Sequence, residues 1–206
     1  MSRLLLVRHG ISGHNIDYRM AGCRSDIDMA AGGYRQVEQL RDRLAGEKID
    51  AVYSSDMKRA LATAEVLSEN HDVEIIPCPE LREIDYGEVE GLTFEQISQQ
   101  FPDVAELIRQ YDPKIQFPGG ESFREFAARV GKFADRLKKH VSSETILVTA
   151  HGGTVRTLVC QLLGIGLEHW RQIRIDNASL TIIDTNPGGA IISLLNDTSH
   201  LRDVVS

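Results

Sequence analysis

The chain has 206 residues, which is enough for one well-buried core but short for two full domains. Its hydrophobic content of 42% and charged content of 26% are typical of a globular protein in water. The formal net charge of -7 argues against a nucleic-acid-binding surface, which requires a basic face. The net charge does not exclude an anionic ligand, because a local cluster of arginines can dominate one pocket.

The three cysteines have neither the spacing of metal ligands nor that of a disulfide framework; they are Cys23, Cys78 and Cys160. We therefore expect reduced thiols in a cytoplasmic protein. The apolar run at 3–7 is too short for a signal peptide or a membrane-spanning helix, so no membrane association is expected.

The first predicted strand covers residues 3–7, and Arg8 and His9 follow it without a spacer. A buried strand that ends in this way places a cation and an imidazole at the carboxyl edge of a sheet, where open α/β sheets bind their ligands. Ser12 and Asn15 come shortly afterwards, and both can donate hydrogen bonds to an anion.

Further along, helical spacing of apolar residues alternates with short β-branched runs. Ser54, Ser55 and Asp56 are residues that favour helix capping, and Arg59 falls in the first turn of the helix that follows them. The predicted elements of this part are a helix over 33–44, a strand over 50–53, a helix over 57–69 and a strand over 73–77.

From residue 79 to about 140 the pattern changes to helices and loops, with breaks at Pro102 and around Pro118. After this part, a strong strand leads directly into His151 and Gly152, and a hairpin ends the pattern. The predicted elements are helices over 94–101, 104–111 and 121–140, a strand over 145–149, a helix over 154–163, and hairpin strands over 180–184 and 190–195.

Strands that alternate with helices predict an α/β fold with helices on both faces of a largely parallel sheet. We expect a three-layer sandwich with a mostly parallel central sheet, one antiparallel edge strand and a helical cap insertion. Residues 1–206 are predicted to form a single domain, and the helical insertion at about 79–140 is expected to cover the carboxyl edge of the sheet.

The candidate catalytic residues follow the ends of four predicted strands. If the sheet is parallel, the groups after these strands meet at one edge; they are Arg8, His9, Arg59, Glu83 and His151. Guanidinium groups bind phosphoryl oxygens, an imidazole can attack phosphorus, and a carboxyl group can protonate a departing alkoxide. The set therefore predicts a phosphate-handling site.

Four blocks occur in an order and at a spacing that make chance unlikely: LLLVRHG at 4–10, YSSDMKRALATAE at 53–65, LREIDYGEVEG at 81–91 and VTAHGGTVR at 148–156. With these blocks the sequence resembles the histidine phosphatase superfamily, which has the phosphoglycerate mutase-like fold. The length and the PGGESF segment at 118–123 are similar to those of its phosphatase branch, such as alpha-ribazole phosphatases and broad-specificity bacterial phosphatases.

The resemblance implies catalytic roles. His9 would be the nucleophile that becomes phosphorylated, and Arg8, Arg59 and His151 would surround the phosphoryl group. Glu83 would protonate the leaving group and then deprotonate the water that hydrolyses phosphohistidine. The physical argument agrees for His9, because two neighbouring guanidinium groups would lower its pKa and keep the ring neutral.

The resemblance also implies substrate-binding positions at Ser12, Asn15, Gly22 and Gly152, in addition to the arginines and His151. It implies no metal ion and no other cofactor. The expected partner is a small phosphorylated metabolite, with no nucleic acid and no membrane, and a homodimer is an open alternative.

Two other functions are weighed against phosphomonoester hydrolysis. One is a cofactor-dependent phosphoglycerate mutase, and the other is a catalytically silent phosphate-binding protein. Ile84 and Asp85 follow Glu83 where the mutases carry Arg and His, which favours a phosphatase. The complete set of five groups argues against a silent protein.

Specificity is expected to depend on the cap rather than on the catalytic groups. Four aromatic residues of this part are candidates for substrate contact, although packing is the favoured role for each of them; they are Tyr86, Phe94, Tyr111 and Phe117.

Overall fold

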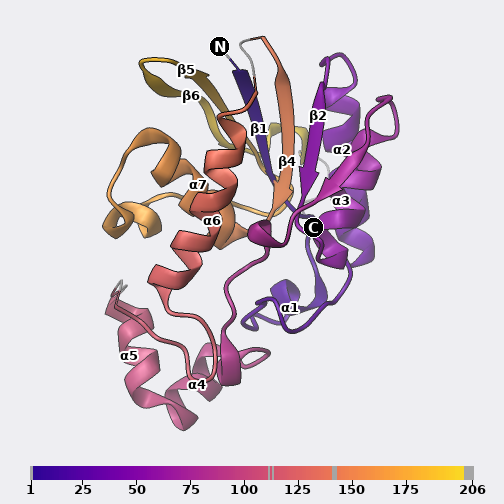
Figure 1. The fold of residues 1–206 in the computed structure, drawn as a ribbon. Helices are drawn as coiled ribbons and strands as arrows, with labels where there is room; N and C mark the ends of the chain where they lie inside the picture. The colour runs from indigo at the N-terminus through magenta and orange to yellow at the C-terminus, as the bar shows by residue number, and fades with distance from the viewer. Residues whose placement is uncertain (1, 111, 113, 141–142, 202–206) are drawn as a thin grey trace.

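The structure is a computed structural model that describes residues 2–110, 112, 114–140 and 143–201. A central sheet is built from β1 (Ser2–Arg8), β2 (Ala51–Ser54), β3 (Ile75–Pro77), β4 (Thr145–Ala150), β5 (Leu180–Asn186) and β6 (Gly189–Asp197). The strand order is β3-β2-β4-β1-β5-β6, so β1 lies inside the sheet (Figure 1).

The directions of the strands follow the predicted pattern. β1 is parallel to β4, β4 to β2, and β2 to β3, whereas β5 is antiparallel to β1 and β6 is antiparallel to β5. The prediction of a mostly parallel sheet with an antiparallel hairpin at one edge is confirmed. β5 runs opposite to both of its neighbours, β1 and β6. The edge strand β6 therefore runs in the same direction as β1.

Helices cover both faces of the sheet and extend beyond its carboxyl edge. The helices of the described residues are α1 (Gly13–Ile16), α2 (Ala31–Leu44), α3 (Lys58–Ser68), α4 (Phe94–Gln100), α5 (Pro102–Gln110), α6 (Phe123–Leu137) and α7 (Gly152–Leu163). Single 3-10 turns are η1 (Pro79–Leu81), η2 (Gly87–Val89), η3 (Leu167–Gln172) and η4 (Ser199–Leu201). α2 and α3 lie on one face and α6 and α7 on the other, which makes the predicted three layers (Figure 1).

The alternation of side chains along β1 divides the core between these faces. Leu4 and Leu6 pack in one cluster with apolar residues of α6 and α7, among them Phe126. Leu5 and Val7 pack in a second cluster with residues of α2 and α3. Because β1 is buried from both sides, the residues that follow it are held by a rigid part of the fold.

α4 and α5 extend beyond the carboxyl edge of the sheet, whereas α6 runs back along the sheet (Figure 1). Phe126 and Phe133 of α6 are fully buried in the same cluster as Leu4 and Leu6 of β1. The part of the 79–140 segment that projects from the sheet is therefore the α4–α5 part, and the extent of the insertion as a unit stays a prediction.

Two local expectations differ from the structure. Ser54, Ser55 and Asp56 do not cap α3, whose N-cap residue is Met57 without a side-chain hydrogen bond. The Ser54 hydroxyl instead donates to the carbonyl of Ser55 (2.7 Å). Pro102 does separate two helices, but as the first residue of α5, where its missing N–H has no cost.

The start of the long helix also differs, because α6 begins at Phe123 and not at residue 121. The Ser122 hydroxyl caps it by accepting a hydrogen bond from the backbone N–H of Glu125 (3.1 Å). Tyr111, the last residue of the predicted 104–111 helix, lies outside the described residues.

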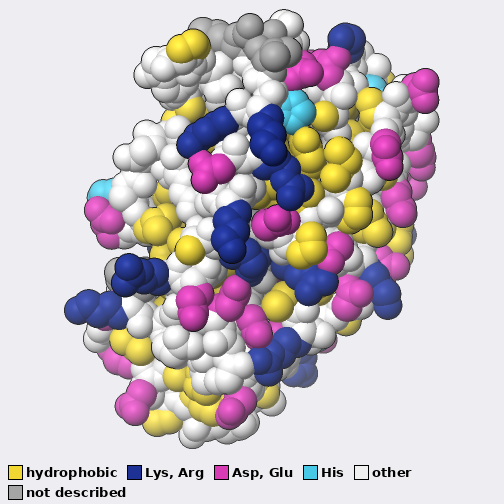
Figure 2. Space-filling model, in the orientation of Figure 1, with side chains coloured by type: hydrophobic (Ala, Val, Ile, Leu, Met, Phe, Trp, Pro, Cys, Tyr) yellow, Lys and Arg dark blue, Asp and Glu magenta, His cyan; other side chains and the backbone are white. Residues whose placement is uncertain are grey.

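The surface carries charges of both signs. On the face in Figure 2, Lys and Arg side chains lie among Asp and Glu side chains over the whole view. Within the described ranges, none of the helices combines the length and the apolar character needed to span a membrane.

Candidate active site

The predicted groups meet at the carboxyl edge of the sheet. His9 follows β1 directly, His151 follows β4, and Arg59 lies in the first turn of α3 after β2. The Nε atom of Arg59 is 3.3 Å from Nε2 of His9 and 3.2 Å from Nδ1 of His151. The centroids of the two imidazole rings are 5.2 Å apart. Three segments that are remote in the sequence therefore converge around one guanidinium group.

The His9 ring is fixed by its own loop. Nδ1 lies 2.7 Å from the carbonyl oxygen of Gly10, so Nδ1 is the protonated nitrogen and donates. Nε2 then keeps its lone pair. Burial, and after it the charges of Arg59 and Arg8, lower the pKa of His9 well below its ordinary value. His9 is therefore a neutral imidazole at neutral pH, and the lone pair of Nε2 accepts from Nε of Arg59 (3.3 Å).

The His151 ring has the opposite tautomer. Its Nδ1 accepts from Nε of Arg59, so Nε2 carries the proton and donates to the Ser55 hydroxyl (2.9 Å). Burial, then Arg59 and His9, lower the pKa of His151 well below its ordinary value. Ser55, predicted as a capping residue, thus orients the second imidazole.

Arg59 is fully buried, and its guanidinium group is held by the loop that precedes α2. Nη2 donates to the carbonyl of Gly22 (2.7 Å) and Nη1 to that of Ser25 (3.3 Å). Because both terminal nitrogens of Arg59 donate to backbone carbonyls, Arg59 offers Nε to the two imidazoles and has no free pair of nitrogens for a bidentate contact. Gly22 touches this arginine through its carbonyl, and a Cβ there would lie 2.8 Å from Cδ2 of Tyr86.

Arg8 supplies a second positive charge. Its Nη1 donates to the carbonyl of Ile175 (2.8 Å), and Nε is buried without a hydrogen-bond partner in the described part of the chain. Burial lowers the pKa of Arg8 to about 10, so the group stays protonated at neutral pH. A Cβ at Gly152 would lie 3.4 Å from Nε of Arg8, so the first residue of α7 is in contact with this guanidinium group. An unpartnered cationic donor beside His9 fits an anionic ligand.

Glu83 is buried beside the first turn of α7. Its Oε2 atom accepts from the backbone N–H of Gly153 (2.8 Å), and Oε1 accepts from the N–H of Ile84 (3.1 Å). A Cβ at Gly153 would overlap Oε1, so the carboxylate occupies space that only glycine leaves free. The carboxyl group is thereby fixed at the edge where His9 and His151 lie.

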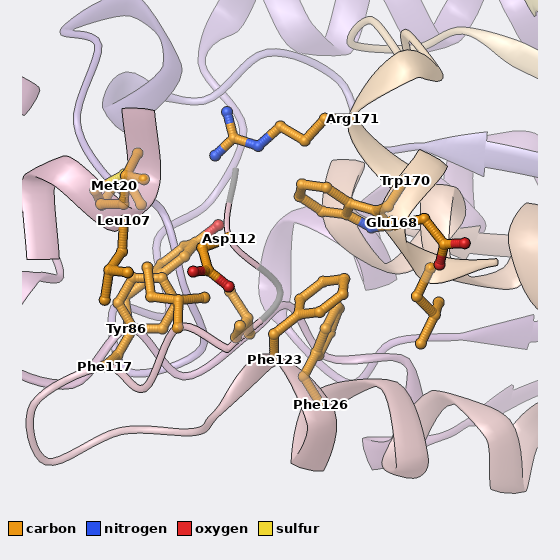
Figure 3. Close-up of a pocket in the computed structure, with 14 residues that line it drawn as sticks. Met20, Tyr86, Leu107, Asp112, Phe117, Phe123, Phe126, Glu168, Trp170 and Arg171 are labelled. Atoms are coloured by element: carbon orange, nitrogen blue, oxygen red, sulfur yellow. The ribbon is translucent and has the colours of Figure 1, made fainter. Parts of the chain in front are cut away.

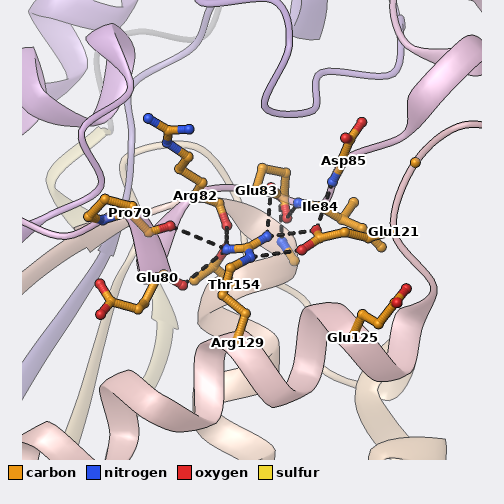
Figure 4. Close-up of polar contacts among 12 residues, drawn as sticks. Pro79, Glu80, Arg82, Glu83, Ile84, Asp85, Glu121, Glu125, Arg129 and Thr154 are labelled. Carbon is orange, nitrogen blue, oxygen red and sulfur yellow. Dashed lines mark hydrogen bonds and ion pairs between the residues drawn. The ribbon is translucent and has the colours of Figure 1, made fainter.

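The segment that carries Glu83 is held from behind by Arg129 of α6 (Figure 4). Its guanidinium group donates to the backbone carbonyls of Glu80 (3.1 Å), Arg82 (2.9 Å) and Glu83 (3.2 Å). It also pairs with both carboxylate oxygens of Glu121, each at 2.8 Å. The sequence analysis missed Arg129, because nothing in the sequence separates it from the other arginines of that helix.

Ser12 and Asn15 shape the loop after β1. The Ser12 hydroxyl is fully buried and donates to Oδ1 of Asn15 (2.9 Å). Nδ2 of Asn177 donates to the same oxygen (3.2 Å) and to the carbonyl of His9 (3.1 Å). Oδ1 of Asn15 is thus used inside the protein, and its amide nitrogen is the group able to donate to a phosphoryl oxygen. Asn177 was missed, since it comes from an irregular segment before β5 that carries no motif.

The chain is similar to known proteins over nearly its whole length. Residues 4–198 match the family described as "Histidine phosphatase superfamily (branch 1)". Phosphoserine phosphatase 1 of Hydrogenobacter thermophilus is 32% identical over 203 residues, which covers 98% of this chain and 96% of the relative. A Proteus mirabilis protein named "Probable phosphoglycerate mutase" is 29% identical over 209 residues, covering 99% and 97% of the two chains.

Among solved structures, the alpha-ribazole phosphatase of Shigella flexneri superposes with a TM-score of 0.88. It is 28% identical and covers 95% of this chain and 96% of that chain. The family match spans nearly all of the sheet and all five predicted catalytic groups. The chain therefore belongs to the histidine phosphatase superfamily, and it is a phosphatase.

Proposed function

We propose that the protein hydrolyses phosphate monoesters of a small metabolite without a metal ion, through a phosphohistidine formed on Nε2 of His9. The observation that carries the proposal is the bond from Nδ1 of His9 to the Gly10 carbonyl, which leaves Nε2 as the basic nitrogen at the convergence of the strand ends. The depressed pKa of His9 keeps that nitrogen unprotonated.

In the first step, Nε2 of His9 attacks phosphorus while the bond between phosphorus and the ester oxygen breaks. The electron pair of that bond goes to the alcohol oxygen, which takes the proton of Glu83 and leaves as a neutral alcohol. Arg8, Arg59 and His151 stabilise the charge on the non-bridging oxygens in a buried site where their fields are strong.

In the second step, the Glu83 carboxylate takes a proton from water while the water oxygen bonds to phosphorus. The bond from phosphorus to Nε2 breaks, its electron pair returns to the imidazole, and inorganic phosphate leaves. Glu83 is then protonated again and His9 is neutral, so the cycle closes without an oxidant, a metal or a second substrate.

The residues after Glu83 support hydrolysis over phosphoryl transfer between two positions of a phosphoglycerate. Ile84 is apolar, and Asp85 is paired with Arg24 (2.6 Å), so neither offers a cation to a substrate carboxylate. The mutase is therefore the second candidate, and a product analysis separates it from the phosphatase.

The test is hydrolysis of p-nitrophenyl phosphate in excess EDTA by the parent and by three variants. His9→Ala should lose turnover by about a thousandfold or more, because no other group attacks phosphorus. Glu83→Gln should lose about 10²- to 10⁴-fold in kcat with an alkyl phosphate and much less with p-nitrophenyl phosphate, whose leaving group needs little protonation. His169→Ala, at an exposed histidine outside the site, is the matched control.

A labelled phosphoryl group should be trapped on the parent and be absent from the His9→Ala variant. Equal hydrolysis by parent and His9→Ala, or activity that EDTA removes, would contradict the proposal. Isomerisation of phosphoglycerate that is faster than release of phosphate would favour the mutase instead.

A further inference from the structure

A pocket lined mostly by apolar side chains lies next to Glu83, between the α4–α5 part and η3 (Figure 3). The empty space between its walls, with the open solvent at its mouth included, is about 570 Å³. The residues that line it include Ile84, Tyr86, Leu107, Phe117, Phe123 and Trp170.

The pocket lies beside the proposed acid, to which two of its lining residues are linked. Ile84 lines the pocket and also donates its backbone N–H to Glu83 Oε1 (3.1 Å). From the other wall, Nε1 of Trp170 donates to the carbonyl of Gly153 (3.1 Å), and the N–H of Gly153 donates to Glu83 Oε2 (2.8 Å). Ile84 on one wall thus bonds directly to the carboxyl group that would protonate the departing alcohol. Trp170 on the other wall is linked to the same group through a single residue, Gly153.

The pocket is also close to the charged groups that are predicted to bind phosphate. Burial, and after it the carboxylate of Glu83, raise the pKa of Tyr86, which also feels the charge of Arg8. Tyr86 also lies against Gly22, because a Cβ at Gly22 would be 2.8 Å from Cδ2 of Tyr86, and the carbonyl of Gly22 accepts from Nη2 of Arg59 (2.7 Å). The pocket therefore begins next to the groups predicted to bind phosphate.

The interior of the pocket suits a flat apolar group. Tyr86 and Phe117 meet edge to face with centroids 4.9 Å apart, and Phe123 and Trp170 meet in the same way at 5.3 Å. Phe117 and Phe123 are buried, and the one N–H of the Trp170 ring is already used. Aromatic faces and edges in such an arrangement accept another ring favourably.

A compact charged alcohol is a poorer match for this interior. The ammonium and carboxylate groups of a phosphoamino acid would be removed from water against aromatic walls, which is costly without paired charges. Three charged residues of the described part of the chain line the pocket: Glu168 and Arg171 are exposed and Asp112 is half-buried, and none of the three belongs to the aromatic pairs.

We propose that this aromatic pocket binds the alcohol part of the substrate, and that the preferred substrates are phosphate monoesters whose alcohol carries an aromatic or similarly flat apolar group. The proposal rests on the proposed function, because it takes Glu83 as the group that protonates the alcohol.

The test compares kcat/KM for three esters of primary alcohols, which need similar protonation on departure. They are ethyl phosphate, 2-phenylethyl phosphate and phosphoserine. We expect 2-phenylethyl phosphate to exceed both others by about tenfold or more, the discrimination that an apolar pocket provides. The measured quantity in the variants is the ratio of kcat/KM for the phenylethyl ester to that for the ethyl ester, which does not depend on the fraction of folded enzyme.

Phe117→Leu removes one ring from the pocket, and Leu107→Trp fills part of it from a half-buried position that tolerates a large side chain. Both should lower the ratio at least about threefold, since each changes the contact with the ring. Phe94→Leu is the matched control, because Phe94 is exposed on α4 and does not line the pocket; its ratio should equal that of the parent.

A parent ratio near one, or faster turnover of phosphoserine than of the phenylethyl ester, would overturn the assignment of the pocket while leaving the phosphatase proposal intact. An unchanged ratio in both pocket variants would do the same. If the protein hydrolyses none of the three esters, the proposed function is overturned and this assignment with it.

Discussion

The carboxylate of Glu83 accepts hydrogen bonds from two backbone N–H groups and fills the space where a side chain at position 153 would lie. We expect Gly153→Ala to lower kcat about tenfold or more, because the added methyl group would overlap Oε1 of Glu83 and move the proposed acid. Inhibition by inorganic phosphate should change little, since the arginines remain. Steady-state kinetics with an alkyl phosphate and product inhibition measure the two effects.

The matched control is Gly131→Ala in α6. A Cβ there would be at least 3.5 Å from its neighbours, so the substitution fits without displacement. It should leave kcat unchanged and increase the unfolding free energy by about 0.5–1 kcal/mol, because alanine favours a helix interior. An equal loss of kcat in both variants would show that the effect at Gly153 is not specific to Glu83.

At the scale of elements, α6 carries Arg129, which binds the segment of Glu83 through backbone carbonyls (Figure 4). We expect Arg129→Gln to lower kcat about ten- to a hundredfold for an alkyl phosphate, because the acid is no longer held in position. The loss should be much smaller for p-nitrophenyl phosphate, which needs little help from an acid. A merely structural role would lower both rates equally.

Arg124→Gln is the control for that prediction, since Arg124 lies on the same helix but is exposed. Its rates with both esters should match those of the parent. Equal losses for the two esters in Arg129→Gln would assign this arginine to stability alone.

The elements also show which features the sequence could predict. The strand ends after β1 and β4 were predictable, because each short apolar run of β type leads directly into a histidine with a glycine beside it. The contacts of Arg129 and Asn177 were not, because each depends on tertiary packing that brings a helix face or an irregular segment to another loop. The expected cap at Ser54 and Ser55 was wrong, since both hydroxyl groups bond inside the site region instead.

At the scale of the whole molecule, the two buried imidazoles make folding depend on pH. The folded chain keeps His9 and His151 neutral, whereas the unfolded chain protonates them below about pH 6.5. The unfolded state then binds more protons, so the unfolding free energy is highest above that pH and falls as the pH drops toward the lowered pKa values. Each histidine should contribute a loss of about 1.4 kcal/mol per pH unit in this window.

Urea unfolding at about pH 7.5 and about pH 5.5 measures this dependence. His151→Gln should lose less stability than the parent between the two conditions, because it removes one such group. His169→Gln, at an exposed position, should keep the dependence of the parent. A pH dependence that is identical in all three proteins would contradict the assignment to the buried rings.

The position of β1 has a consequence for how the chain acquires its structure during synthesis. Arg3 is in register with Thr145 of β4, and Ser2 with Thr185 of β5, so both neighbours of this early strand come from late parts of the sequence. Contacts of such long sequence separation form slowly and expose apolar strands to aggregation beforehand. The nascent chain therefore has to keep RLLLV unpaired on the ribosome until β4 has emerged, and one edge of that strand stays open until β5 follows. A stalled or truncated product that lacks β5 would expose this edge and be a substrate for chaperones rather than a weak enzyme.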